Sequence, residues 1–227
     1  MDYDGLLDLF KKRRSVRRLK PDPIPDEVID KVIEAGRWAP SGANSQPWEF
    51  LIIKKKELKE QIMALANADR EANLRLEETR PPELRHPQRQ GPNVAEAPVF
   101  IMLLGDERTE DTYPLVAKVN HGRETFISSL ADAFLYMHLA AASLGLGSRW
   151  VSTVNRPYLQ PIIKKMLNIP QHLEIYDMMV LGYPMAQPSP RSVRPREEMV
   201  HRDSYDLAKH RSDEQVSQFI IGLRRSD

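Results

Sequence analysis

Apolar residues recur along the chain at two spacings, and each spacing predicts one type of secondary structure. Recurrence every three or four positions predicts helices at 4–13, 26–38, 55–80, 125–144, 158–167 and 213–223. Short continuous apolar runs predict buried strands at 48–53, 99–104, 149–153 and 176–182. The stretches 81–98 and 105–122 show neither pattern and are predicted to be loops. Strands set among helices favour an α+β fold, a three-layer sandwich with helices on both faces of a central sheet.

The segment from Thr125 to Leu144 has the strongest helical pattern of the chain. Phenylalanine, leucine, methionine and alanine occupy most of its faces. This predicts the central core helix, because a helix that is apolar on most sides is buried on most sides. His138 lies within this helix and is expected to have a structural role.

The composition changes after the last predicted strand. Residues 184–206 are rich in proline, arginine and glutamate, and a short apolar helical pattern follows at 213–223. We predict one domain over 1–206 and a C-terminal arm over 207–227. An apolar patch on an extended segment is hard to bury alone, which favours an arm that wraps a second subunit. A partly disordered tail is the alternative.

The bulk composition limits the possible functions. A net charge of +1 gives no general attraction to nucleic acid or to anionic lipid. The absence of cysteine excludes disulfides, thiolate nucleophiles, iron–sulfur clusters and cysteine zinc sites. The six histidines show no metal-ligand spacing, so no metal is expected. No apolar run is long enough to span a membrane and the first residues do not resemble a secretory signal, which together favour the cytoplasm.

A basic run, K-K-R-R-S-V-R-R-L-K, occupies residues 11–20. Arginine presents a planar fork of donors that suits phosphate, and serine adds a hydroxyl donor. If the stretch is extended, Arg13, Ser15 and Arg17 point to one side and could grip a phosphorylated ligand along its length. A solvated basic face or a nonspecific nucleic-acid patch is the alternative.

A second candidate segment, P-S-G-A-N-S-Q-P-W at 40–48, lies between a predicted helix and a predicted strand. Ser41, Asn44 and Gln46 supply hydrogen-bond donors and acceptors on a loop held by two prolines. Gly42 permits close approach of the backbone to a ligand. Such a loop suits a heteroaromatic ring with a polar edge, and an ordinary capped turn is the alternative.

Taken together, these segments resemble the nitroreductase family of flavoproteins. The strongest matches are R-R-S-V-R at 13–17 and A-P-S-G-A-N-S-Q-P-W-E-F at 39–50. Weaker matches follow at family-like distances: G-L-G-S-R-W at 145–150, V-L-G-Y-P at 180–184 and R-P-R-E-E-M-V-H at 194–201. The resemblance covers roughly residues 8–65 and 94–205.

The resemblance implies an intertwined homodimer with a mixed sheet sandwiched by helices. It also implies two FMN sites at the dimer interface, each built from both chains. From the basic run, Arg13 would meet the FMN phosphate, Arg14 and Ser15 would line the ribityl and ring region, and Arg17 would reach the pyrimidine edge.

The remaining ligands implied by the resemblance come from three other places. The other subunit would contribute a loop whose residues are Pro40, Ser41, Gly42, Asn44 and Gln46. The stretch Trp150, Val151 and Ser152 would pass by the flavin ring. A further cation for the phosphate is expected where Val193 stands, so Arg191 or Arg194 on either side would take that part, with Arg194 the favoured of the two.

The implied activity is a ping-pong reaction. NADH or NADPH reduces FMN and leaves, and a small aromatic acceptor of nitroaromatic or quinone type then enters the same cleft. Arg17 would stabilise the negative charge that develops at the pyrimidine edge on reduction. No side-chain general base is required, so no residue is assigned as catalytic.

Other functions remain open. One is a reductive dehalogenase similar to iodotyrosine deiodinase, whose lid uses a glutamate, a tyrosine and a lysine. Residues 66–98 contain glutamates but neither tyrosine nor lysine, which disfavours this activity. Another is a branch of the family that fragments reduced flavin, which no residue here supports. A different class is a non-enzymatic protein whose basic arm at 11–20 binds nucleic acid.

The 81–98 stretch is a candidate lid over the site. It is flanked or occupied by basic and titratable residues, namely Arg80, Arg85, His86 and Arg89. A lid of this composition would favour an acidic or phenolate substrate.

Overall fold

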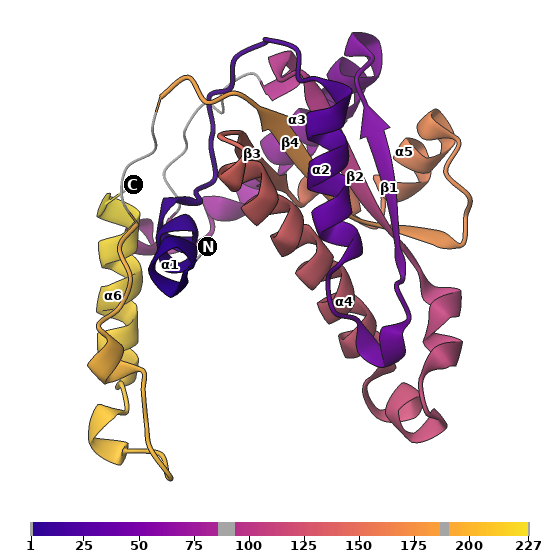
Figure 1. The fold of residues 1–227 in the computed structure, drawn as a ribbon. Coiled ribbons are helices and arrows are strands. Elements are labelled where there is room, and N and C mark those ends of the chain that lie inside the picture. The colour runs from indigo at the N-terminus through magenta and orange to yellow at the C-terminus, as the bar shows by residue number, and fades with distance from the viewer. Residues whose placement is uncertain (1, 86–93, 187–190, 227) are drawn as a thin grey trace. The chain divides into compact units, whose positions relative to one another are not determined.

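The computed structural model describes residues 2–85, 94–186 and 191–226. For residues 224–226 it describes the backbone only. Its chain forms two compact units, which we describe separately. The first is Met1–Asn67 with Gly91–Ser189, and the second is Ala68–Gln90 with Pro190–Asp227. The helices and strands of the described residues are α1 (Tyr3–Lys12), α2 (Asp26–Arg37), β1 (Trp48–Ile53), α3 (Lys56–Glu77), β2 (Val99–Asp106), α4 (Leu115–Ser143), β3 (Gly147–Val151), α5 (Gln160–Leu167), β4 (Leu173–Gly182) and α6 (Asp213–Ser226) (Figure 1).

A four-stranded sheet in the order β1-β2-β4-β3 forms the centre of the first unit. Each neighbouring pair of strands is antiparallel, with Trp48 opposite Gly105 in the first pair and Gly147 opposite Gly182 in the last. Between described residues, the one parallel contact is an isolated bridge of Ser15 with Ser148. All four predicted strands are present, although β3 begins two residues earlier than predicted.

The two faces of the sheet carry separate apolar cores. In β2, Val99, Ile101 and Leu103 join a buried cluster with α2 and α4. The alternating residues of β2 from Phe100 to Leu104 join a second cluster with α3 and α5. Successive side chains of a strand point to opposite faces, so a fully apolar strand requires cover on both. The predicted three-layer sandwich is therefore confirmed.

Helix α4 crosses one face of the sheet as the predicted core helix, and it is longer than its pattern indicated. It begins at Leu115, and His121 interrupts it with a φ of −156°. The prediction of a loop over 105–122 is therefore wrong for residues 115–122, which are helical on both sides of the kink at His121. By length and composition α4 alone, among the described residues, could cross a membrane, but 44% of its most apolar window is buried in the protein.

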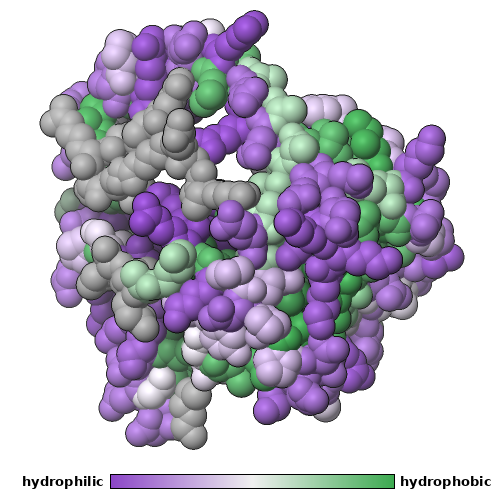
Figure 2. Space-filling view, turned by 90° about the horizontal axis from the view of Figure 1, so that it is seen from above, coloured by the Kyte–Doolittle hydropathy of each residue, from purple (hydrophilic) through white to green (hydrophobic). Residues whose placement is uncertain are grey.

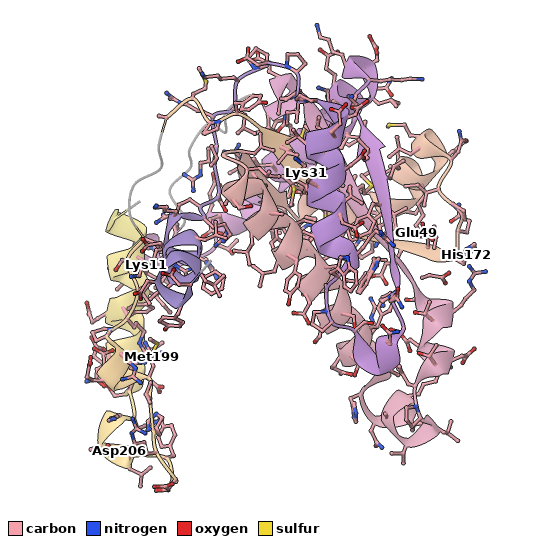
Figure 3. All side chains as sticks on the ribbon, viewed as in Figure 1. Lys11, Lys31, Glu49, His172, Met199 and Asp206 are labelled. Atoms are coloured by element: carbon pink, nitrogen blue, oxygen red, sulfur yellow. The ribbon has the colours of Figure 1, made fainter. Side chains whose placement is uncertain are left out.

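The second unit contains the end of α3, a short 3-10 turn at Pro82–Leu84 and α6, which contacts that turn. Arg85 donates hydrogen bonds to the carbonyl oxygens of Glu78 (2.7 Å) and Arg80 (2.9 Å) at the end of α3. None of the described side chains between 191 and 223 is buried. Met199 and Asp206 mark this C-terminal segment in Figure 3.

Candidate functional site

The basic run lies along the edge of the sheet beside β3 and the end of β4. The amide of Val16 donates to the carbonyl of Ser148 (2.9 Å), and the amide of Lys20 donates to the carbonyl of Tyr183 (2.8 Å). Val16 and Leu19 are buried in the core. Burial of these two residues leaves Ser15 and Arg17 exposed, and Arg13 and Arg14 partly exposed. The backbone of Arg13 is extended, with φ −60° and ψ 122°, whereas Lys11 and Lys12 belong to the end of α1.

Arg14 has an unmet hydrogen-bond donor. Its Nη1 atom is buried and has no hydrogen-bond partner among the described residues. Guanidinium groups carry donors only, and a buried donor without an acceptor costs on the order of 1–3 kcal/mol. A phosphate or hydroxyl oxygen of a ligand would satisfy this donor, so the basic run fits a phosphorylated cofactor.

His138 on α4 lies behind the basic run and fixes Ser148. Its Nδ1 atom is 2.7 Å from the hydroxyl oxygen of Ser148. Burial and, to a lesser extent, the positive charge of Arg13 lower the pKa of His138 to about 3. The imidazole is therefore neutral at physiological pH, as its expected structural role requires.

Three side chains, those of His138, Phe134 and Asp177, contact the indole of Trp150. The ring stacks on His138 with an interplanar angle of 11°, and the edge of Phe134 meets it at a centroid distance of 4.5 Å. Its Nε1 donates a hydrogen bond to Asp177 Oδ2. The side chain is 37% exposed, so part of this fixed ring is available to a ligand or to another chain. Its neighbour Val151 is buried, and Ser152 is exposed.

A β-bulge brings Asp177 beneath Trp150. The register of β2 with β4 shifts between Leu103, which is opposite Asp177, and Leu104, which is opposite Ile175. Tyr176 is the additional residue, and bulges of this type redirect side chains. Burial raises the pKa of Asp177 to about 6, although hydrogen bonds from Trp150 and Ser152 act in the opposite direction.

The Pro40–Pro47 loop has an unusual backbone that its own side chains support. Ala43, Asn44 and Gln46 all have positive φ angles, of 50°, 53° and 45°. The amide of Gln46 donates to Ser41 Oγ (3.0 Å), and the amide of Gly42 donates to Ser129 Oγ of α4 (3.2 Å). Positive φ is costly for residues other than glycine and is often retained at functional sites.

Both candidate segments contact α4, but at different positions along it. The loop contacts Ser129, whereas the basic run reaches His138 through Ser148. These two residues of α4 are nine positions apart, a rise of roughly 14 Å. The two segments are therefore supported at two positions of α4 that lie roughly 14 Å apart along its axis.

Arg191 and Arg194, the two candidates for the third cation, belong to the second unit. Arg194 Nε lies 3.3 Å from Glu198 Oε2 in an ion pair, and its guanidinium is 22% exposed. Arg191 is exposed. Of the candidate lid, Arg85 is bonded to carbonyls of its own unit, while His86 and Arg89 lie outside the described residues.

Several residues of the site did not emerge from the sequence. Ser129 and Asp177 are polar residues of largely apolar segments, and Ser148 lies in the G-L-G-S-R-W segment without an assigned role. A polar residue in an otherwise apolar strand, such as Asp177, is the only local signal, because buried polar groups are retained with partners. Among the described residues, no group of three or more His, Asp or Glu is arranged to hold a metal.

Comparison with known proteins agrees with this description. The nitroreductase family profile matches residues 10–183. The chain is 30% identical over 203 residues to an iodotyrosine deiodinase of Thermotoga neapolitana, covering 87% of this chain and 96% of that protein. It is 26% identical over 221 residues to an NAD(P)H FMN reductase of Bacillus subtilis, covering 91% and 79%. A solved iodotyrosine deiodinase bound to FMN and 3-iodo-L-tyrosine superposes with a TM-score of 0.66, at 26% identity over 88% of this chain and all of that one.

The fold and the basic run define an α+β protein whose surface suits a phosphorylated ligand. The chain belongs to the nitroreductase family. It is an oxidoreductase, and the resemblance found in the sequence is confirmed.

Gly42→Ala is expected to damage the loop. A Cβ atom there would lie 2.2 Å from Thr125 Cγ2. Overpacking of this kind costs about 1–3 kcal/mol, so the free energy of unfolding measured in urea should fall by that amount. The double variant Gly42→Ala with Thr125→Ser removes the clashing methyl group and should restore stability. Equal stability of wild type and Gly42→Ala would contradict the tight packing of this loop.

The buried Asp177 is expected to make folding stability depend on pH. Its folded pKa of about 6 lies above the ordinary value of 3.8 expected in the unfolded chain. The contribution to stability is therefore complete below pH 4 and is lost as the pH rises through 6. Between pH 5 and pH 8 the wild type should lose on the order of 1 kcal/mol that Asp177→Asn does not lose, measured by urea unfolding. An identical pH dependence in both proteins would contradict this assignment.

Proposed function

We propose that this protein reduces a small aromatic acceptor, of nitroaromatic or quinone type, at flavin sites shared between two copies of the chain. Its family and its relatives show that the protein is an NAD(P)H-dependent flavin oxidoreductase with FMN as its cofactor. A cytoplasmic location remains the expectation from the sequence.

The main support for the proposal is that the basic run has a fixed backbone and a buried donor without a partner among the described residues. Its backbone is fixed by the bonds of Val16 and Lys20, while Arg14 retains a buried donor with no partner in the described part of the chain. A segment that served only as a solvated face would have no reason to bury such a donor. Arginine forks bind phosphate through charge-assisted hydrogen bonds, which fits the phosphorylated flavin.

We assign the residues around the flavin as follows. Arg13 binds the phosphate, Arg14 and Ser15 line the ribityl and ring region, and Arg17 lies at the pyrimidine edge. Trp150 and Ser152 border the ring, with the backbone of Val151 between them. Arg191 remains the more available of the two candidates for the third cation, because Glu198 engages Arg194.

The separation of the two motifs on α4 supports a site that is shared with a second copy. A loop that lies roughly 14 Å along α4 from the support of the basic run can meet the basic run of a partner across a two-fold axis. Exposed apolar residues of α4, Ile127 and Leu135, lie eight positions apart and share one side of the helix. The C-terminal segment likewise exposes Tyr205, Leu207 and Phe219. Both surfaces are suited to cover by another chain.

Exposed apolar surface also supports association with a second chain. Figure 2 shows hydrophobic areas between the hydrophilic residues on the face seen from above. Trp38, at the end of α2 just before the loop, is 77% exposed, and its Nε1 is fixed by Glu34 Oε1 at 2.8 Å. A large, fixed and exposed aromatic residue beside a candidate site loop is typical of an interface.

In the proposed reaction, the residues of this chain position the ligands and stabilise developing charge. Bound FMN supplies the redox chemistry, accepting a hydride from NAD(P)H and passing electrons to the acceptor. The guanidinium of Arg17 favours negative charge at the pyrimidine edge. The reductant and the acceptor use the same cleft in turn, which gives the parallel-line kinetics of a ping-pong reaction.

Reductive dehalogenation of an aromatic substrate is the second candidate. It is favoured by the 30% identity to a deiodinase over 96% of that protein. The stretch 66–98 contains no tyrosine and no lysine, so recognition of an amino-acid substrate would need other residues. Steady-state rates with 3-iodotyrosine, a nitroaromatic and a quinone separate these candidates.

Complementation between two damaged chains tests the shared site. Arg17→Ala and the double variant Ser41→Ala with Asn44→Ala are each expected to lose most of the reductase activity as homodimers. When the two chains are co-expressed with different tags, the heterodimer should recover about half of the wild-type activity, because one of its two sites carries neither change.

The control is a dimer of two Arg17→Ala chains that carry the two different tags, and it should stay inactive. A site formed within one chain predicts no recovery in the mixed heterodimer, since every site would then carry one change. Absence of recovery with intact dimers on gel filtration would contradict the proposal.

A further inference from the structure

Asp177 is a buried acid in the middle of the sheet. The side chain belongs to β4 and is 4% exposed. Trp150 Nε1 donates to Oδ2, and Asn155 Nδ2 donates to Oδ1 at 3.1 Å. Asn155 also donates to the carbonyl of Tyr176 at 3.0 Å, so the same amide holds the bulged backbone and the carboxylate.

No arginine or lysine pairs with Asp177 among the described residues, and its described partners are neutral donors. A carboxylate buried without a cation is unfavourable compared with an apolar residue of similar size. Core packing alone therefore does not account for an acid at this position. Its neighbours Ile175 and Met178 do belong to the apolar core.

The acid acts on one side chain that reaches the surface. The indole of Trp150 has His138 against one face and the edge of Phe134 close by. The ring of Tyr176 is also near, at a centroid distance of 6.3 Å. The hydrogen bond from Nε1 to Asp177 adds a directional restraint on the two side-chain torsions of Trp150, because it defines the direction of the N–H bond.

We propose that Asp177 is a positioning residue of the flavin site, which fixes the indole of Trp150 as a wall of that site. The inference rests on the proposed function for the location of the flavin beside Trp150. The bond between Asp177 and Trp150 is independent of it. Asn155 and the β-bulge hold the carboxylate in place, so the wall is attached to the central sheet.

The experiment compares four variants of the full-length protein. Asp177→Val removes both acceptor oxygens at nearly constant volume, and Asp177→Asn retains one oxygen that can accept from Trp150. Trp150→Phe removes the donor and retains an aromatic ring. Glu174→Gln is the matched control, an acid-to-amide change on the same strand at a residue that pairs with Arg123 outside the site.

Two readouts are measured at pH 8. The first is the FMN dissociation constant from a fluorescence titration. The second is the indole N–H signal of Trp150 in nitrogen-15-labelled protein, assigned by its loss in Trp150→Phe. This signal requires no bound flavin.

We expect Asp177→Val to weaken FMN binding about tenfold and to shift the Trp150 signal toward that of a solvent-exposed indole. Asp177→Asn should show a smaller change in both, and Glu174→Gln should show none. Adding Asp177→Val to Trp150→Phe should weaken binding no further, because the two residues act through one bond.

Additive losses in the double variant, or an unchanged Trp150 signal in Asp177→Val, would overturn the proposal. If Asp177→Val does not fold, Asp177→Asn decides by the same two readouts. A wild-type protein that binds no FMN contradicts the proposed function instead, and this result appears before any variant is compared.

Discussion

The attachment of the basic run to the edge of the sheet is the constraint on which the proposed site depends. Two backbone hydrogen bonds and the burial of Val16 and Leu19 fix an extended segment whose remaining side chains are cationic. Seven basic residues within ten positions would repel one another and remain mobile in a free segment. Fixed at the sheet, they form a preorganised surface with one buried guanidinium donor unmet.

Helix α4 connects this surface to the second candidate segment. It contacts the Pro40–Pro47 loop at Ser129 and supports the basic run at His138, roughly 14 Å apart along its axis. A stiff helix cannot shorten this separation. The same helix exposes the apolar residues Ile127 and Leu135, which a second chain can cover.

The sequence predicted most of the fold because its apolar patterns are strong and local. The run Val99–Leu104 was recognised as a strand buried on both faces, and Asp26 marked the start of α2. The start of α4 was missed, since the apolar stretch from Leu115 to Val119 is short and is separated from Thr125 by a kink at His121. Gly122 follows this kink, and a Cβ atom there would lie 3.1 Å from Glu110 Oε2.

The motif residues of the site were predictable, whereas their supporting residues were not. Arg13 to Arg17 and Ser41 to Gln46 stand in short patterns that can be recognised along the chain. Asp177 reaches Trp150 through a bulge that depends on the pairing of β2 with β4, and pairing between distant segments leaves no local trace. Ser129 likewise acquires its role only when α4 packs beside the loop.

The most direct test of the central claim is the difference in affinity between FMN and riboflavin, which lacks the phosphate. If the basic run holds a phosphorylated flavin, the wild type should bind FMN at least tenfold more tightly than riboflavin. Arg13→Ala should remove most of this difference while leaving riboflavin binding unchanged, because charge-assisted bonds to phosphate contribute roughly 1.5–3 kcal/mol. Equal affinities for the two flavins, or a preference for FMN that survives in Arg13→Ala, would contradict the account.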